Sequence, residues 1–109
     1  MKLEHYNKDK LKQELLNIFS KYLDKSSYLV FFFGSRVENK NNERSDIDIG
    51  IIGPPIKPSI FQKIEEEIEN LNILYKIDLV DFNYVSEEFK KIALKNIEPI
   101  YGEIKNIIE

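Results

Sequence analysis

Two aspartates, Asp46 and Asp48, are the first residues in this sequence that could do chemistry. They lie two apart in an apolar stretch that has the pattern of a β-strand. Residues two apart on a strand project from the same face, so both carboxylates share one face and isoleucines occupy the other. Neighbouring carboxylates repel each other unless a positive charge lies between them. A divalent cation that prefers oxygen ligands, Mg²⁺ or Mn²⁺, is the simplest such charge.

A glycine–serine turn precedes this pair. Gly34 and Ser35 directly follow the apolar residues 29–33. Glycine lets the backbone approach a ligand closely, and exposed amides in a turn can face an anion. The turn therefore favours a phosphate. Carboxylates for a metal together with a turn for phosphate indicate nucleotide chemistry.

The two arginines of the chain lie in the same region. Among sixteen basic residues only Arg36 and Arg44 are arginines. The planar guanidinium fork suits phosphate oxygens better than a lysine does. We therefore predict phosphate contact for both residues. Arg44 has a second interpretation, in which it pairs with Asp46 or Glu43.

A third carboxylate, Asp78, lies downstream between Ile77 and Leu79. Strands are depleted in aspartate, so an aspartate between apolar strand residues suggests a function. A catalytic role for Asp78 and a role in pairing at a strand end both remain open. Asp81 would point to the opposite face, and we predict that it forms a solvated turn.

These side chains need a scaffold, and the hydrophobic pattern supplies one. Periods of two and of 3.6 residues alternate along the chain. Strands are predicted over residues 29–33, 45–52 and 75–82, and helices over residues 11–23, 58–71 and 86–93. The second helix could begin with Pro58 in its first turn or with a capping box of Ser59 and Gln62. The last helix would be capped by Ser86 and bury three side chains, those of Phe89, Ile92 and Ala93.

The spacing resembles a known signature. Gly34 and Ser35, then ten residues, then Asp46 and Asp48 between two apolar strands resemble the DNA polymerase β-like nucleotidyltransferases. The short length and the Gly-Ser-Arg opening most resemble the minimal nucleotidyltransferases within them. The resemblance covers residues 28–102. Asn39 stands where the family usually has a second glycine, and asparagine is the next most tolerant residue of a positive φ.

The resemblance implies a fold and a site. The fold would be α/β, of the α+β type, with a small mixed, twisted sheet, helices mainly on one face and the carboxylates on an open face. Two Mg²⁺ ions would be held by the catalytic carboxylates Asp46, Asp48 and Asp78, with Asp78 also accepting a proton. ATP would be the co-substrate, with its phosphates bound by Gly34, Ser35, Arg36 and Arg44.

The resemblance also leaves three functions open. The chain could transfer AMP from ATP to a hydroxyl of a HEPN-type helical partner, as an antitoxin. It could instead be an antitoxin or assembly subunit that neutralises such a partner by binding alone. Transfer to a small molecule is the third possibility. Three clustered carboxylates favour an enzyme, because binding alone does not require them.

Bulk properties limit the remaining possibilities. A chain of 109 residues indicates one domain over 1–109, so any second surface around the site would come from a partner or a homo-oligomer. A net charge of −3 argues against strong nucleic-acid binding. No apolar run approaches the roughly 20 residues of a membrane span. The absence of cysteine excludes disulfides and thiolate sites, and the expected location is cytoplasmic.

An acidic run, Glu65, Glu66 and Glu67, could be a solvated helix face or a docking surface.

Overall fold

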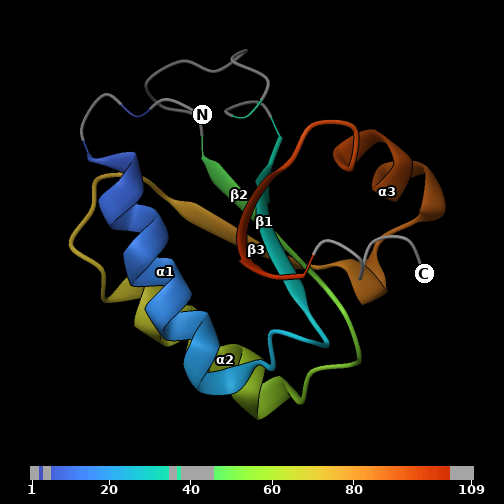
Figure 1. Cartoon of the computed structure of the whole chain (residues 1–109), viewed down its shortest axis with the longest axis horizontal. Coiled ribbons are helices and arrows are strands. Elements are labelled where there is room, and N and C mark those ends of the chain that lie inside the picture. The colour runs from blue at the N-terminus through green and yellow to red at the C-terminus, as the bar shows by residue number, and fades with distance from the viewer. Residues whose placement is uncertain (1–2, 4–5, 35–36, 38–45, 104–109) are drawn as a thin grey trace.

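The computed structural model describes residue 3, residues 6–34, residue 37 and residues 46–103. Its strands form one sheet with helices on both sides (Figure 1). The helices are α1 (Lys8–Tyr22), α2 (Pro58–Glu69), the short 3-10 helix η1 (Phe82–Tyr84) and α3 (Glu87–Ala93). The strands are β1 (Leu29–Phe33), β2 (Ile47–Ile52), β3 (Ile77–Asp81) and β4 (Glu98–Gly102).

The sheet is mixed, as predicted. Its strand order is β3-β2-β1-β4. β1 pairs antiparallel with both β2 and β4, whereas β2 and β3 are parallel. Parallel neighbours require a crossover connection, and α2 provides it between β2 and β3. The two strands that carry the candidate carboxylates are therefore direct neighbours.

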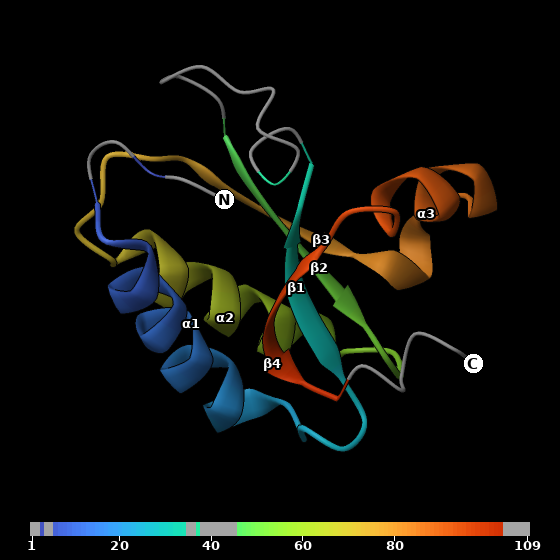
Figure 2. The same cartoon turned by 45° about the horizontal axis from the view of Figure 1, so that its top comes forward.

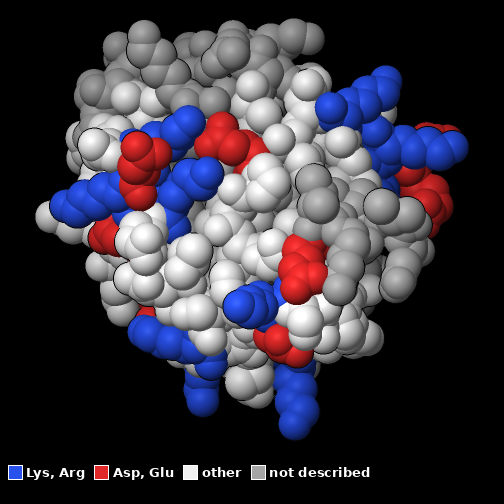
Figure 3. Space-filling view, in the orientation of Figure 1, with Lys and Arg blue, Asp and Glu red and all other residues white. Residues whose placement is uncertain are grey.

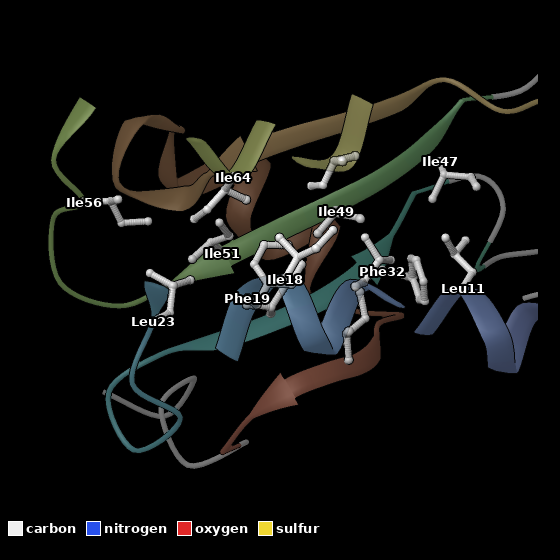
Figure 4. Close-up of a cluster of buried hydrophobic side chains, with 14 of the residues drawn as sticks. Leu11, Ile18, Phe19, Leu23, Phe32, Ile47, Ile49, Ile51, Ile56 and Ile64 are labelled. Atoms are coloured by element: carbon white, nitrogen blue, oxygen red, sulfur yellow. The ribbon is translucent and has the colours of Figure 1, made fainter. Parts of the chain in front are cut away.

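The main core lies between the sheet and the helices α1 and α2, which cover the same face in both views (Figure 2). The isoleucines of β2 that alternate with the carboxylates point into this core, and Ile49 packs there beside Phe19 and Phe32 (Figure 4). Asn7 caps α1 by accepting a hydrogen bond from the amide of Lys10 at 3.0 Å. The helices therefore lie mainly on one face, as predicted.

The opposite face of the sheet is partly covered, so the expectation of an open face is corrected. A second apolar cluster forms there from β1, η1 and α3: Leu29, Phe31, Phe33, Phe82 and Ala93. The rings of Phe31 and Phe82 meet edge to face with centroids 5.2 Å apart. Every residue of β1 is buried, so its alternate side chains need a cover on this face as well. The carboxylates lie on this face, beyond the apolar cluster.

Gly50 of β2 makes room for this second cluster. A Cβ at position 50 would lie 2.6 Å from ring atoms of both Phe31 and Phe82. We expect Gly50→Ala to lower the free energy of unfolding by about 1–3 kcal/mol, the usual cost of overpacking a core. Thermal and urea unfolding followed by circular dichroism measures the change. An unchanged midpoint would mean that the two rings yield without cost.

The structure decides where α2 begins, and it shows that α3 buries fewer side chains than predicted. α2 begins with Pro58 in its first turn, and its N-cap Lys57 makes no side-chain hydrogen bond, so the capping-box alternative is wrong. Ser86 caps α3 as predicted, accepting from the amide of Phe89 at 3.1 Å. Of the three side chains expected to be buried, only Ala93 is. Phe89 is 41% exposed and Ile92 is 70% exposed.

The acidic run of α2 divides between two surroundings. Glu67 faces α1, where it pairs with Lys21 at 2.5 Å and accepts a hydrogen bond from the hydroxyl of Tyr22. Glu65 and Glu66 are exposed. Glu67 therefore contributes to helix packing, and of the acidic run only Glu65 and Glu66 remain available for a docking surface.

Lysines and acidic side chains are interspersed over the face shown in Figure 3, with uncharged surface between them. Over the described residues this face has no continuous basic patch of the kind that binds phosphate backbones. Within the same part of the chain, no helix has the length and the apolar character needed to cross a membrane.

Candidate active site

The register of β2 and β3 brings two of the predicted carboxylates side by side. Asp48 and Asp78 are paired positions of these parallel strands. Asp46 immediately precedes β2 and lies two residues from Asp48, so strand periodicity directs it to the same face. On its other side Asp48 is paired with Phe33, the last residue of β1. Three strands therefore contribute to one carboxylate-bearing surface.

The charges on this surface influence one another. Burial raises the pKa of the Asp48 carboxyl, and the negative charges of Asp78 and then Asp46 raise it further. The amine of Lys76 lies 3.7 Å from the Asp78 carboxylate and forms an ion pair with it. Repulsion among oxygen ligands of this kind is what a bound divalent cation relieves. The donor set therefore fits Mg²⁺ or Mn²⁺.

The side-chain positions themselves are not those of a closed metal site. Among the residues that the structure describes, no three acidic, histidine or cysteine side chains converge closely enough to hold an ion. Asp78 is turned toward Lys76 instead. The side chain of Asp78 would have to leave Lys76 to bind the same metal ion as Asp48.

Gly34 lies directly against the Asp48 carboxylate. Its φ of +86° is in the left-handed region, and a Cβ there would lie 2.3 Å from Oδ2 of Asp48. The amide of Val37 donates to the Gly34 carbonyl at 3.2 Å and closes the turn. Only glycine fits both the backbone angle and the close approach. The turn that the sequence assigns to phosphate thus begins at the candidate metal ligand.

The other predicted phosphate ligands, Ser35, Arg36 and Arg44, lie outside the described residues. Asp81 accepts hydrogen bonds from the backbone and side-chain amides of Asn83 and caps η1, in keeping with its predicted role in a turn.

A surface hollow of about 710 Å³ adjoins the carboxylates and continues around the edge of β3. On the carboxylate face it is lined by Asp48, Asp78 and the exposed apolar side chains of α3. On the other face it reaches Glu65 and Glu69 of α2. The hollow therefore straddles the edge strand and does not lie on one face alone.

Sequence reasoning missed three residues of this surface: Lys76, Phe89 and Ile92. Lys76 had a usable signal, because a residue two positions before Asp78 on a strand shares its face. Phe89 and Ile92 gave a misleading signal, since apolar residues on a short helix are normally buried.

The fold and the site define a class of protein, and comparison with known families agrees. The family model described as polymerase beta, nucleotidyltransferase, matches residues 13–106. The chain therefore belongs to the polymerase beta nucleotidyltransferase family.

The chain is also similar to an individual protein with a named activity. The probable protein adenylyltransferase MntA of Haemophilus influenzae is 33% identical over 69 residues, which cover 62% of this chain and 60% of that protein. The match thus spans less than two thirds of the relative's length.

Two solved structures share the fold. A chain in the crystal structure of a toxin–antitoxin with AMP-PNP has a TM-score of 0.64 and 18% identity, covering 89% of this chain and 77% of that one. A chain in the structure of the tri-AMPylated Shewanella oneidensis HEPN toxin in complex with MNT antitoxin has a TM-score of 0.60 and 16% identity, covering 90% of this chain and 75% of that one.

Proposed function

We propose that this chain is an adenylyltransferase that moves AMP from ATP onto a hydroxyl group of a HEPN-type partner protein and thereby acts as an antitoxin. The observation that carries the proposal is the register of Asp48 with Asp78, next to the Gly34 turn. Likeness to a protein adenylyltransferase and to an AMPylated toxin–antitoxin complex supports the choice of AMP and of a protein acceptor. A family match over residues 13–106 supports one nucleotidyltransferase domain.

The residues on the carboxylate face have complementary roles in this proposal. Asp46, Asp48 and Asp78 would hold divalent cations, which neutralise the triphosphate when bound. The Gly34 turn would place backbone amides against the phosphates, and we assign Ser35, Arg36 and Arg44 to the same phosphates. The absence of cysteine from the sequence and the use of ATP both fit a cytoplasmic location.

The transfer itself is a displacement at the α-phosphorus of ATP. The acceptor hydroxyl oxygen forms a bond to this phosphorus, while the bond from phosphorus to the oxygen bridging to the β-phosphate breaks. Pyrophosphate leaves with that oxygen. The hydroxyl proton passes to the carboxylate of Asp78, the candidate base. Positioning and charge neutralisation supply most of the rate in such a reaction.

Incubation with labelled ATP, Mg²⁺ and a HEPN-type protein encoded beside this chain tests the proposal. We expect the partner to gain label and a mass of one or more AMP units, located on a hydroxyl by mass spectrometry. The Asp48→Asn chain is the control and should leave the partner unlabelled. A complex that forms without labelling would favour neutralisation by binding alone, and label on a small molecule would overturn the choice of acceptor.

A further inference from the structure

The outer edge of β3 has no strand beside it among the described residues, because β3 ends the strand order of the sheet. All five of its residues are half-buried, unlike the fully buried β1. The carbonyl of Lys76 accepts from the amide of Ile47 at 2.9 Å, so this residue's backbone faces β2. Backbone groups along a strand point to its two sides alternately, so those of Ile77 and Leu79 point outward. Such an edge is a template for another strand.

Exposed apolar side chains surround this edge. The four large ones that the structure shows well exposed are Leu74, Tyr84, Phe89 and Ile92. Leu74 lies just before β3 and Tyr84 just after it, at 83% and 82% exposure. The other two line the hollow that straddles the strand. A gathering of this kind around one unpaired edge indicates a binding surface.

The shape of the surface suits an extended chain. The main hollow touches both faces of β3, and two further hollows, of about 440 and 260 Å³, continue past its two ends. A small ligand would occupy one face. An added strand places alternate side chains on both faces and runs along the whole edge.

The charges around the main hollow indicate what kind of strand fits. Among the described residues that line it are four carboxylates, those of Asp48, Asp78, Glu65 and Glu69, and one amine, that of Lys76. Among the described residues of that lining the one cation, Lys76, pairs with Asp78, which leaves acidic charge in excess on the α2 face. A second copy of this chain would bring the same acidic residues to the contact and would be repelled. A segment with basic side chains on its α2-facing side is complementary.

We propose that the outer edge of β3 binds an extended segment of the partner protein as an added antiparallel strand, and that this segment presents the acceptor hydroxyl opposite Asp78. Facing side chains on neighbouring strands have their Cβ atoms about 4.5–5.5 Å apart, so a hydroxyl-bearing residue there would lie beside the candidate base. The residues before and after this hydroxyl-bearing residue in the segment would point toward Glu65 and Glu69. The identity of the acceptor as a partner hydroxyl rests on the proposed function, whereas strand addition does not.

Two synthetic peptides of one composition test the proposal by binding, without requiring transfer. The in-phase peptide has the core Val-Lys-Tyr-Lys-Val, which puts tyrosine and valines on the carboxylate face and lysines on the α2 face. The inverted peptide has the core Lys-Val-Tyr-Val-Lys. With fluorescent labels and anisotropy as the readout, we expect the full chain to bind the in-phase peptide at least about tenfold more tightly. Equal binding, or no saturable binding of the in-phase peptide, would overturn the proposal.

Backbone methylation separates strand addition from other docking. In a strand added antiparallel to β3, with the tyrosine opposite Asp78, the amides of the two lysines face β3 and the amide of the tyrosine faces away. Methylation of both lysine nitrogens should weaken binding about tenfold or more, since two hydrogen bonds to β3 are lost. Methylation of the tyrosine nitrogen should leave binding unchanged. Equal effects from the two methylated peptides would contradict a paired strand.

A matched pair of protein variants tests the register in which the segment binds. Glu65 lines the hollow, whereas its exposed neighbour Glu66 does not and accepts instead from Gln62 at 3.3 Å. Glu65→Lys should weaken binding of the in-phase peptide about three- to tenfold, the range of a reversed surface pair. Glu66→Lys makes the same charge change and should have little effect. Equal losses would place the segment elsewhere.

Two outcomes distinguish this inference from the proposed function. AMP transfer to the partner that is unaffected by Glu65→Lys and by excess in-phase peptide would overturn the inference and leave the function standing. Peptide binding in the expected pattern without any AMP transfer would support the β3 edge as a docking site and count against the enzyme.

A chain that sediments as a dimer and loses this state when the in-phase peptide binds would identify a second copy as the occupant and overturn the choice of partner.

Discussion

Replacing Asp48 with asparagine is expected to lower the rate of AMP transfer about a hundredfold or more and to stabilise the metal-free chain. The loss of rate follows from removing a carboxylate beside Asp78, since lost charge-stabilising groups cost about 10²–10³ in rate. The gain in stability follows from the repulsion and burial that raise the pKa of this carboxyl in the fold. Single-turnover labelling and thermal unfolding in chelator measure the two effects.

The pH dependence gives the sign of the stability effect. Because the pKa of Asp48 is raised above its usual 3.8, the folded chain binds this proton more tightly than the unfolded chain. The stability that the protonated form contributes is lost as pH rises through the folded pKa. We therefore expect Asp48→Asn to exceed the natural chain in stability at pH 7. The difference should shrink as the pH falls toward 3.8.

Metal binding provides a readout independent of transfer. Mg²⁺ that binds only the folded chain raises its unfolding temperature by mass action. We expect this shift for the natural chain and its absence in Asp48→Asn. Asp81→Asn is the control, because Asp81 caps η1 and its change should cost some stability but no activity. Full turnover by a stably folded Asp48→Asn chain would remove Asp48 from the site.

Gly34→Ala is expected to abolish measurable AMP transfer. The alanine Cβ would lie 2.3 Å from Oδ2 of Asp48, so the carboxylate must move. The φ of +86° adds strain of about 1–2 kcal/mol for any residue with a Cβ. Transfer and ATP binding should therefore be lost together. Equilibrium dialysis with labelled ATP measures the second.

Two comparisons separate the contact with Asp48 from general damage to the fold. Adding Asp48→Ala to Gly34→Ala removes the clashing carboxylate, so the two changes should be non-additive in unfolding free energy. Ser35→Ala should weaken ATP binding only modestly, because the backbone amides of the turn remain. Small and equal losses from Gly34→Ala and Ser35→Ala would place the triphosphate elsewhere.

Several features of the site follow from the sequence without a structure. The common face of Asp46 and Asp48 follows from the two-residue period of a strand, which is a property of the backbone. β1 occupies the predicted residues 29–33, because an apolar run of this length that ends at a glycine is too short for most helices and favours a buried strand. The Ser86 cap is equally local. Each of these depends on residues within a few positions of one another.

Other features needed the tertiary structure. The start of α2 at Pro58 could not be chosen from the sequence, because the signals for Pro58 in the first turn and for a capping box of Ser59 and Gln62 are both present there. The need for glycine at position 50 comes from Phe31 and Phe82, which are distant in sequence.

The surroundings of the carboxylates were decided in the same way. Asp78 adjoins Asp48 because β3 pairs with β2, although the whole of α2 separates the two strands in the sequence. Phe89 and Ile92 stay exposed because α3 covers only part of the sheet. Periodicity fixes which side chains share a face of one element. Only the packing of distant elements decides which of those faces meet and which remain free.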